Sequence, residues 1–181
     1  MAALLRVALL ALCTLLLSAC FVSETPLIAE TDSVTPIAPG TYRSADESAS
    51  SGEEGIVTVE GTKTILSDKD DSGDVYLMRK VRGDYYVMME LPKDKDDGYI
   101  YMLVRVSSSS FISFDFSDYC EALQTLAQAQ GVSIESYGVA RVEDGDSASC
   151  YFTKFGDLAR AFETLLDNAA FHSYEVFTRV P

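Results

Sequence analysis

Apolar and polar residues alternate, or apolar residues run together in short stretches, through the middle of this 181-residue chain. The connecting segments at 82–84, 92–98 and 107–110 are short and polar, and connections of this kind favour antiparallel hairpins. The central part of the chain is therefore predicted to be an antiparallel β-meander. Its strands are expected where branched and aromatic residues concentrate, at 56–59, 62–67, 75–81, 85–91, 99–106 and 111–116.

The hydrophobic period changes in the C-terminal half. Apolar residues at 119–127 recur at helical spacing, with Ser117 or Asp118 available as the N-cap. A second apolar stripe at 155–169 continues over about four helical turns. The remaining apolar segments read as strands around a turn at 143–146, namely 136–142, 147–153 and 173–180.

From residue 111 onward the predicted order is strand, helix, strand, strand, helix, strand. That order resembles the β-α-β-β-α-β arrangement of ferredoxin-like folds. We expect one α+β domain at 39–181, in which the N-terminal antiparallel β-meander precedes a C-terminal half with this ferredoxin-like order. Within it, the segment 44–55 is rich in Ser, Asp and Glu and is expected to be a mobile acidic loop.

The strands between 75 and 106 are apolar on both faces, although an antiparallel sheet with one wet face should alternate more cleanly. Either the helices and N-terminal strands cover the second face, or a ligand or partner docks on it. Tyrosine and methionine suit adaptable contacts. The candidate ligand or partner face consists of Tyr76, Met78, Tyr86 and Met88.

The N-terminus has the form of an export signal. Arg6 precedes an apolar run at 7–17 that is too short to span a bilayer as a mature helix. The run ends in Leu17-Ser18-Ala19-Cys20, which resembles the lipobox of bacterial lipoproteins. The resemblance implies a signal peptide at 1–19 and acyl chains, such as palmitate, on Cys20. The alternative is an ordinary signal peptide with a coincidental cysteine.

The same resemblance implies a location in the cell. Phe21 stands where the inner-membrane retention signal of many enteric lipoproteins has Asp, which implies the periplasmic face of the outer membrane. Residues 20–38 are rich in Ser, Thr, Glu and Pro, so we expect a flexible tether. The expected partners are the membrane, held through the lipid on Cys20, and a possible envelope protein.

The charge balance excludes other partners. The chain has 14 Lys and Arg against 28 Asp and Glu, a net charge of −14. Removing the signal peptide removes Arg6 and leaves 13 basic residues against 28 acidic ones, or −15. Such a surface repels phosphate backbones and anionic headgroups, because both bind through Lys and Arg. We expect no nucleic-acid partner, and attachment to the membrane by lipid and not by charge.

Two thiols remain once Cys13 is removed with the signal peptide and Cys20 is acylated. These are Cys120, at the start of the first predicted helix, and Cys150, on the strand before the second. In an oxidising compartment a disulfide is expected. The alternative is a reactive thiol at a helix N-terminus.

One acidic loop resembles the first half of an EF-hand calcium loop, with Gly73 at its sixth position. The resemblance ends there, because the twelfth position is Arg79 where a bidentate Glu is needed. The loop is therefore either a weak calcium site, the one cofactor suggested, or a solvated acidic turn. Its possible ligands are Asp68, Asp70, Ser72 and Asp74.

The sequence offers few catalytic groups. The only histidine, His172, follows the second predicted helix, and no nucleophile or phosphate-loop motif is present. Asp115 and Asp118 are the best pair for a carboxylate-dependent hydrolase, although 28 acidic residues produce such pairs by chance. We therefore expect a non-enzymatic binding or structural lipoprotein of the cell envelope. The alternatives are that hydrolase and a weak calcium-binding envelope protein.

Overall fold

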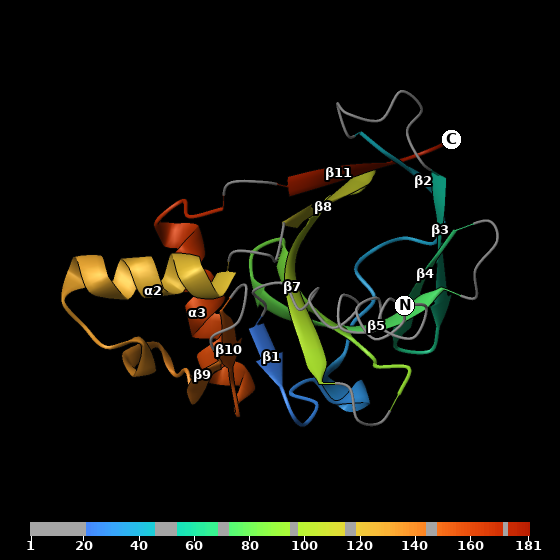
Figure 1. The fold of residues 1–181 in the computed structure, drawn as a ribbon. Helices are drawn as coiled ribbons and strands as arrows, with labels where there is room; N and C mark the ends of the chain where they lie inside the picture. The colour runs from blue at the N-terminus through green and yellow to red at the C-terminus, as the bar shows by residue number, and fades with distance from the viewer. Residues whose placement is uncertain are drawn as a thin grey trace, which may run out of the picture.

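Eight antiparallel strands close into a barrel (Figure 1). The computed structural model describes residues 21–45, 54–68, 73–94, 98–114, 119–143, 148–171 and 174–181. Within these ranges each strand from β2 to β8 pairs with the next along the chain, and β11 closes the ring between β8 and β2. The barrel strands are β2 (Gly40–Ser44), β3 (Glu54–Glu60), β4 (Lys63–Ser67), β5 (Asp74–Arg82), β6 (Tyr85–Glu90), β7 (Tyr99–Val106), β8 (Ser110–Phe114) and β11 (Tyr174–Arg179).

A smaller sheet extends from one edge of β7. The second half of β7 pairs with β8, which leaves its first half to β1 (Phe21–Ser23). The parallel partner of β1 is β10 (Ser149–Tyr151), and β9 (Arg141–Glu143) pairs with β10. β7 thus belongs to both the barrel and the smaller sheet.

The helices lie in the chain between β8 and β11 and on the same side of the barrel as the smaller sheet (Figure 1). They are α2 (Tyr119–Gln130) and α3 (Phe155–Asp167). Of the two short 3-10 helices, η2 (Ile134–Tyr137) follows α2, and η1 (Glu30–Asp32) lies between β1 and β2. The helices predicted at 119–127 and 155–169 are confirmed. In α3 the apolar stripe becomes a row of buried side chains: Leu158, Ala161, Phe162 and Leu165.

The wall formed by β5, β6 and β7 is buried on both faces, because successive side chains of a strand point to opposite sides. The outward side chains pack under the helices, and they are Leu77, Val87, Met89, Tyr101 and Leu103. The inward side chains fill the barrel, and they are Tyr76, Met78, Met88, Met102 and Val104. This arrangement explains why the sequence is apolar on both faces of these strands.

The expected α+β fold with a ferredoxin-like C-terminal half is wrong. The strands on either side of the helices, β8 and β11, belong to the barrel, whereas β9 and β10 join β1. The strand expected at 136–142 is instead η2 followed by the short β9. In a ferredoxin-like unit these strands would pair only with one another. Here β2 pairs with β11 and β1 pairs with β10, so strands from the N-terminal part of the chain occupy those edges.

The segment expected to be a flexible tether at 20–38 is part of the folded domain from Phe21 onward. The Phe21 side chain is completely buried, and its ring centroid lies 4.9 Å from those of Phe152 and Phe162. Ile28 lies in the core under the helices and Ile37 in the barrel core. The segment has no regular period because it buries single side chains from irregular backbone, which periodicity does not detect.

Residues of the same segment fasten it to one end of the barrel. Ser33 Oγ donates a hydrogen bond to the carbonyl of Thr62 and accepts one from the Met78 amide, both at 3.0 Å. The Val34 amide donates to the Met78 carbonyl at 2.8 Å. These bonds secure the chain beside the β3–β4 turn before it enters β2.

Truncating Phe21 tests whether this segment belongs to the core. Phe21→Ala should lower the free energy of unfolding of the mature domain by about 3–5 kcal/mol, the range for deleting a buried aromatic ring. The matched control Val22→Ala, at the half-buried neighbouring position, should cost about 1 kcal/mol. Urea unfolding measures both values. An equal loss of unfolding free energy in the two variants would indicate that the segment is a tether and not part of the core.

Candidate functional site

A cavity of about 230 Å³ opens at the end of the barrel where β3 begins and β4 ends. Its lining comes from strands at the start of the barrel sequence, β2 to β5, and from β8 and β11, which close the barrel. The polar lining side chains are Ser67, Asp68 and Asp74, at the edge of the cavity. The wall is therefore apolar and the edge is acidic. The apolar lining side chains are Tyr42, Ile56, Val57, Leu66, Phe111 and Phe177.

Gly73 lets the acidic edge lie close to the end of β4. Its φ of +78° is in the left-handed region, and a Cβ there would lie 2.7 Å from the Leu66 carbonyl oxygen. Glycine avoids both the strain and the clash. The first residue of β5, Asp74, is thereby held beside Leu66, its partner in the strand register.

A polar row crosses the inner wall of the barrel below this edge. Thr64, Tyr76 and Glu90 are direct neighbours in the register of β4, β5 and β6. Side chains of directly paired residues project to the same face, and Tyr76 belongs to the barrel core, so the row faces inward. Thr64 Oγ1 is completely buried and has no hydrogen-bond partner among the described residues. Leaving a buried hydroxyl without a partner is costly, and this hydroxyl is the one unsatisfied polar side chain among the described residues of the barrel.

Negative charge is unfavourable in this part of the barrel. Burial, together with the nearby Asp74 carboxylate, raises the pKa of Glu90, and Lys93 lowers it by a smaller effect. Burial and the same two carboxylates raise the pKa of Tyr76 above its usual value. Lys93 Nζ lies 2.9 Å from Asp74 and compensates part of the acidic charge. A further anion at the mouth would meet this repulsion.

The candidate ligand or partner face lies inside the barrel. Tyr76, Met78 and Met88 are buried in the barrel core, and Tyr86 is half-buried against it. The opposite barrel wall, which includes the N-terminal strands β2 and β3, covers this face, while the helices cover the other one, in line with the first of the two explanations. Because Tyr76, Met78 and Met88 are buried, this face offers no surface to a protein partner.

The acidic loop is described only at its ends. Asp68 and Asp74 both line the cavity, whereas Asp70 and Ser72 lie outside the described residues. In the ranges that the structure covers, no three Asp, Glu, His or Cys side chains converge as a metal site. The calcium site stays a prediction.

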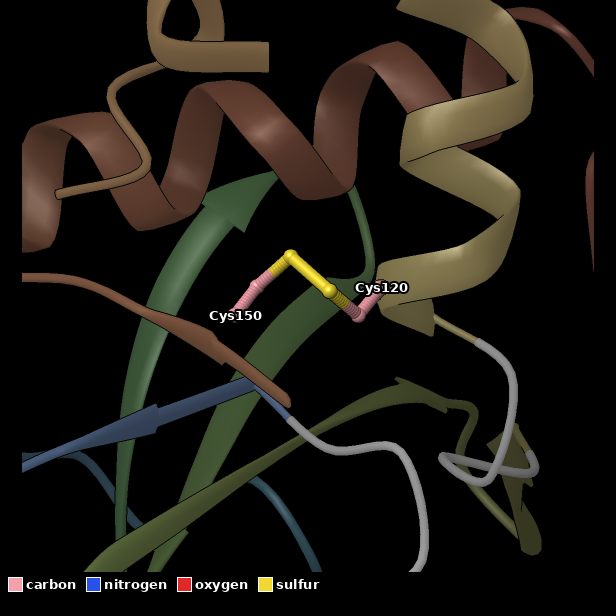
Figure 2. Close-up of a disulfide and its surroundings, with 2 residues drawn as sticks. All are labelled: Cys120 and Cys150. Carbon is pink, nitrogen blue, oxygen red and sulfur yellow. A yellow bond between two sulfur atoms is a disulfide. The ribbon is translucent and has the colours of Figure 1, made fainter. Parts of the chain in front are cut away.

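The predicted disulfide between Cys120 and Cys150 is confirmed. The two Cα atoms lie 5.3 Å apart, and both side chains are completely buried. Figure 2 shows the bridge running beneath α3, from β10 to the first turn of α2. Closing a loop of this length stabilises a domain by about 3.5 kcal/mol in the loop-entropy description. Because both sulfurs are bonded, the alternative of a reactive thiol at Cys120 does not hold.

Four other candidate residues lie outside the described residues. They are Cys20, His172 and the carboxylate pair Asp115 and Asp118. The lipid anchor and the hydrolase pair therefore stay predictions.

Sequence reasoning did not find the cavity. Its lining comes from β2, β3, β4, β5, β8 and β11, which only the closure of the barrel brings together. The sequence contains one trace of the cavity. In β4 every second side chain, Thr64 and Leu66, points into the barrel, and Asp74 and Tyr76 do the same in β5. Without the barrel register, this alternation does not indicate a shared interior.

Comparison with known proteins gives no family. No protein-family model matches the chain, and neither a characterised protein nor a solved structure is significantly similar to it. In the part of the chain that the structure describes, no helix is long and apolar enough to cross a bilayer. The features of the chain that bear on its function are therefore the cavity and the sequence before Phe21.

Replacing Glu90 tests the electrostatics of the barrel mouth. Because the folded state raises the pKa of Glu90, its ionisation lowers stability as the pH rises through that pKa. Glu90→Gln should therefore be more stable than the parent at about pH 7, and the difference should shrink towards about pH 4, where Glu90 is protonated. Urea unfolding at both pH values measures this. A variant that is less stable than the parent at the higher pH contradicts the assignment.

Proposed function

We propose that this protein is an exported, lipid-anchored lipoprotein of the cell envelope that binds a small ligand, without catalysis, at the mouth of its barrel. The observation that carries the binding role is the cavity of about 230 Å³ at the end of a closed eight-stranded barrel. Barrels of this strand number have interiors just wide enough to be filled by side chains or to hold one small ligand. Here the lining leaves space at one end.

The size of the cavity sets the size of the ligand. A cavity of roughly 150 Å³ accommodates benzene, and pockets for drug-sized molecules begin at roughly 300 Å³. The barrel mouth falls between the two. Its ligand is therefore a molecule with one or two rings, or a short branched chain.

The charges at the mouth set the polarity of the ligand. Aromatic and aliphatic side chains make up most of the wall, while Asp68 and Asp74 lie at the edge. Further inside the barrel, burial and, by a smaller effect, the Asp74 carboxylate raise the pKa values of Glu90 and Tyr76. A neutral or cationic apolar molecule fits this field, and an anion of the same shape does not.

Two observations support the envelope location. The Leu17-Ser18-Ala19-Cys20 motif resembles a lipobox, which implies acylation of Cys20 and cleavage before it. The disulfide between Cys120 and Cys150 is of a kind that persists in oxidising compartments. We place the protein on the periplasmic face of the outer membrane, on the resemblance at Phe21.

Three probes with one phenyl ring test the cavity. Benzylamine and benzyl alcohol should bind with a Kd of about millimolar or tighter, and benzoate should bind much more weakly, because only benzoate adds negative charge. Saturation-transfer NMR and calorimetry measure the three affinities.

A pair of leucine variants assigns that binding to the mouth. Leu66→Phe adds volume to a cavity wall and should abolish binding, whereas Leu91→Phe changes a half-buried leucine on the helix-covered side and should leave it intact. Equal binding of the three probes, or loss of binding in Leu91→Phe alone, contradicts the proposed site.

Labelling with radioactive palmitate tests the anchor. The parent chain should incorporate label, and globomycin, which blocks the lipoprotein signal peptidase, should cause the uncleaved form to accumulate. Cys20→Ser should carry no label, while the matched control Cys13→Ser, inside the signal peptide, should carry as much as the parent. Equal labelling of Cys20→Ser and the parent would contradict the proposal that Cys20 carries the lipid.

A further inference from the structure

We propose that the domain rests on the membrane through an aromatic ledge formed by Tyr85, Phe114, Phe171 and Tyr174, and that the lipid bilayer holding Cys20 is what this ledge contacts. The inference rests on the proposed lipid anchor. It adds a defined orientation, in which one surface of the domain faces the lipid headgroups.

The first argument is the absence of a spacer between the anchor and the core. Cys20 precedes Phe21 directly, and adjacent Cα atoms are separated by about 3.8 Å. The Phe21 side chain is completely buried, in a strand that pairs on both edges. An acylated Cys20 therefore holds the domain at the bilayer surface, and the surface around Phe21 is the one that meets lipid.

The second argument is that buried aromatic rings connect Phe21 to the ledge. The Phe21 ring centroid lies 5.4 Å from that of Tyr119, which lies 5.5 Å from that of Phe171. The Phe171 and Phe114 rings lie 4.8 Å apart. Phe114 in turn lies 6.2 Å from Tyr85 and 6.4 Å from Tyr174. The aromatic contacts thus run without a break from the residue after Cys20 to the surface.

The third argument is the exposure of Tyr174. Its side chain is 63% exposed, more than Val34 at 44% and Val132 at 42%, the other exposed large apolar residues among those described. Tyrosine is enriched at the boundary between lipid and water, where its ring contacts apolar groups and its hydroxyl stays hydrated. Tyr174 is therefore the residue of the ledge best placed to enter the headgroup region.

The fourth argument is local charge. Tyr85 pairs in the strand register with Arg82 and Arg105. Each arginine is matched by a carboxylate, with Arg82 Nη1 2.7 Å from Asp167 and Arg105 Nε 4.0 Å from Asp84. Glu175 follows Tyr174, but its carboxylate accepts a hydrogen bond from Ser44 Oγ, and successive strand residues point to opposite faces. The charges that the structure describes beside Tyr85 are thus paired, on a chain whose net charge is −14.

Tryptophan fluorescence tests the orientation, because the natural chain contains no Trp. Three single-Trp variants, Tyr174→Trp, Val34→Trp and Val132→Trp, place the probe on the ledge or at one of two matched exposed positions. The acylated proteins are inserted into phosphatidylcholine vesicles with bromine atoms near the start of the acyl chains. Tyr174→Trp should lose most of its fluorescence relative to plain vesicles, and the two controls should lose none.

The outcomes separate the ledge from the anchor. Acylated, vesicle-bound protein in which Tyr174→Trp is unquenched, or in which all three variants are quenched alike, overturns the ledge and leaves the lipid anchor standing. A chain that mass spectrometry shows to carry no acyl group on Cys20 overturns both. If Tyr174→Trp is already shielded from aqueous acrylamide before vesicles are added, a second copy of the chain occupies the ledge and the proposal fails.

Discussion

Phe21 packs against Phe152 and Phe162 at the point where β1 connects β7 to β10. This packing joins the two parts of the domain, because β7 belongs to the barrel whereas Phe152 and Phe162 belong to the segment inserted between β8 and β11. The disulfide from Cys150 to Cys120 joins α2 to the same strand that pairs with Phe21. Without β1, the inserted helices would have lost their strand connection to β7.

The two faces of the wall of β5, β6 and β7 belong to two separate cores, one under the helices and one inside the barrel. Its outward leucines and methionine fix the helices, so the inward face is free to line a closed barrel. The barrel interior is well filled beside β7 and less filled at the mouth, where Asp68 and Asp74 replace apolar residues at the edge. Packing on the outside thus stabilises the barrel, and the interior provides a space for a ligand.

Local patterns predicted what local interactions determine. The hairpin at 82–84 and the stripe of α3 were readable because their partners lie a few residues away. The disulfide followed from the export signal and the count of cysteines. The strand β1 was not readable, because Phe21 is a single buried residue in a segment without a regular period and its partner, Cys150, lies far along the chain. The ferredoxin-like expectation failed at the same point, because barrel closure by β2 and β11 leaves no local trace. The cavity shares that origin.

The central claim is that the chain is folded from Phe21, the residue that directly follows Cys20, the proposed lipid attachment site. Hydrogen–deuterium exchange of the mature protein tests this claim most directly. The account predicts that the amides of β1 exchange as slowly as those of β7, with which β1 is paired, because only global unfolding exposes either strand. Exchange of the β1 amides at the rate of an unfolded peptide, with β7 still protected, would contradict it.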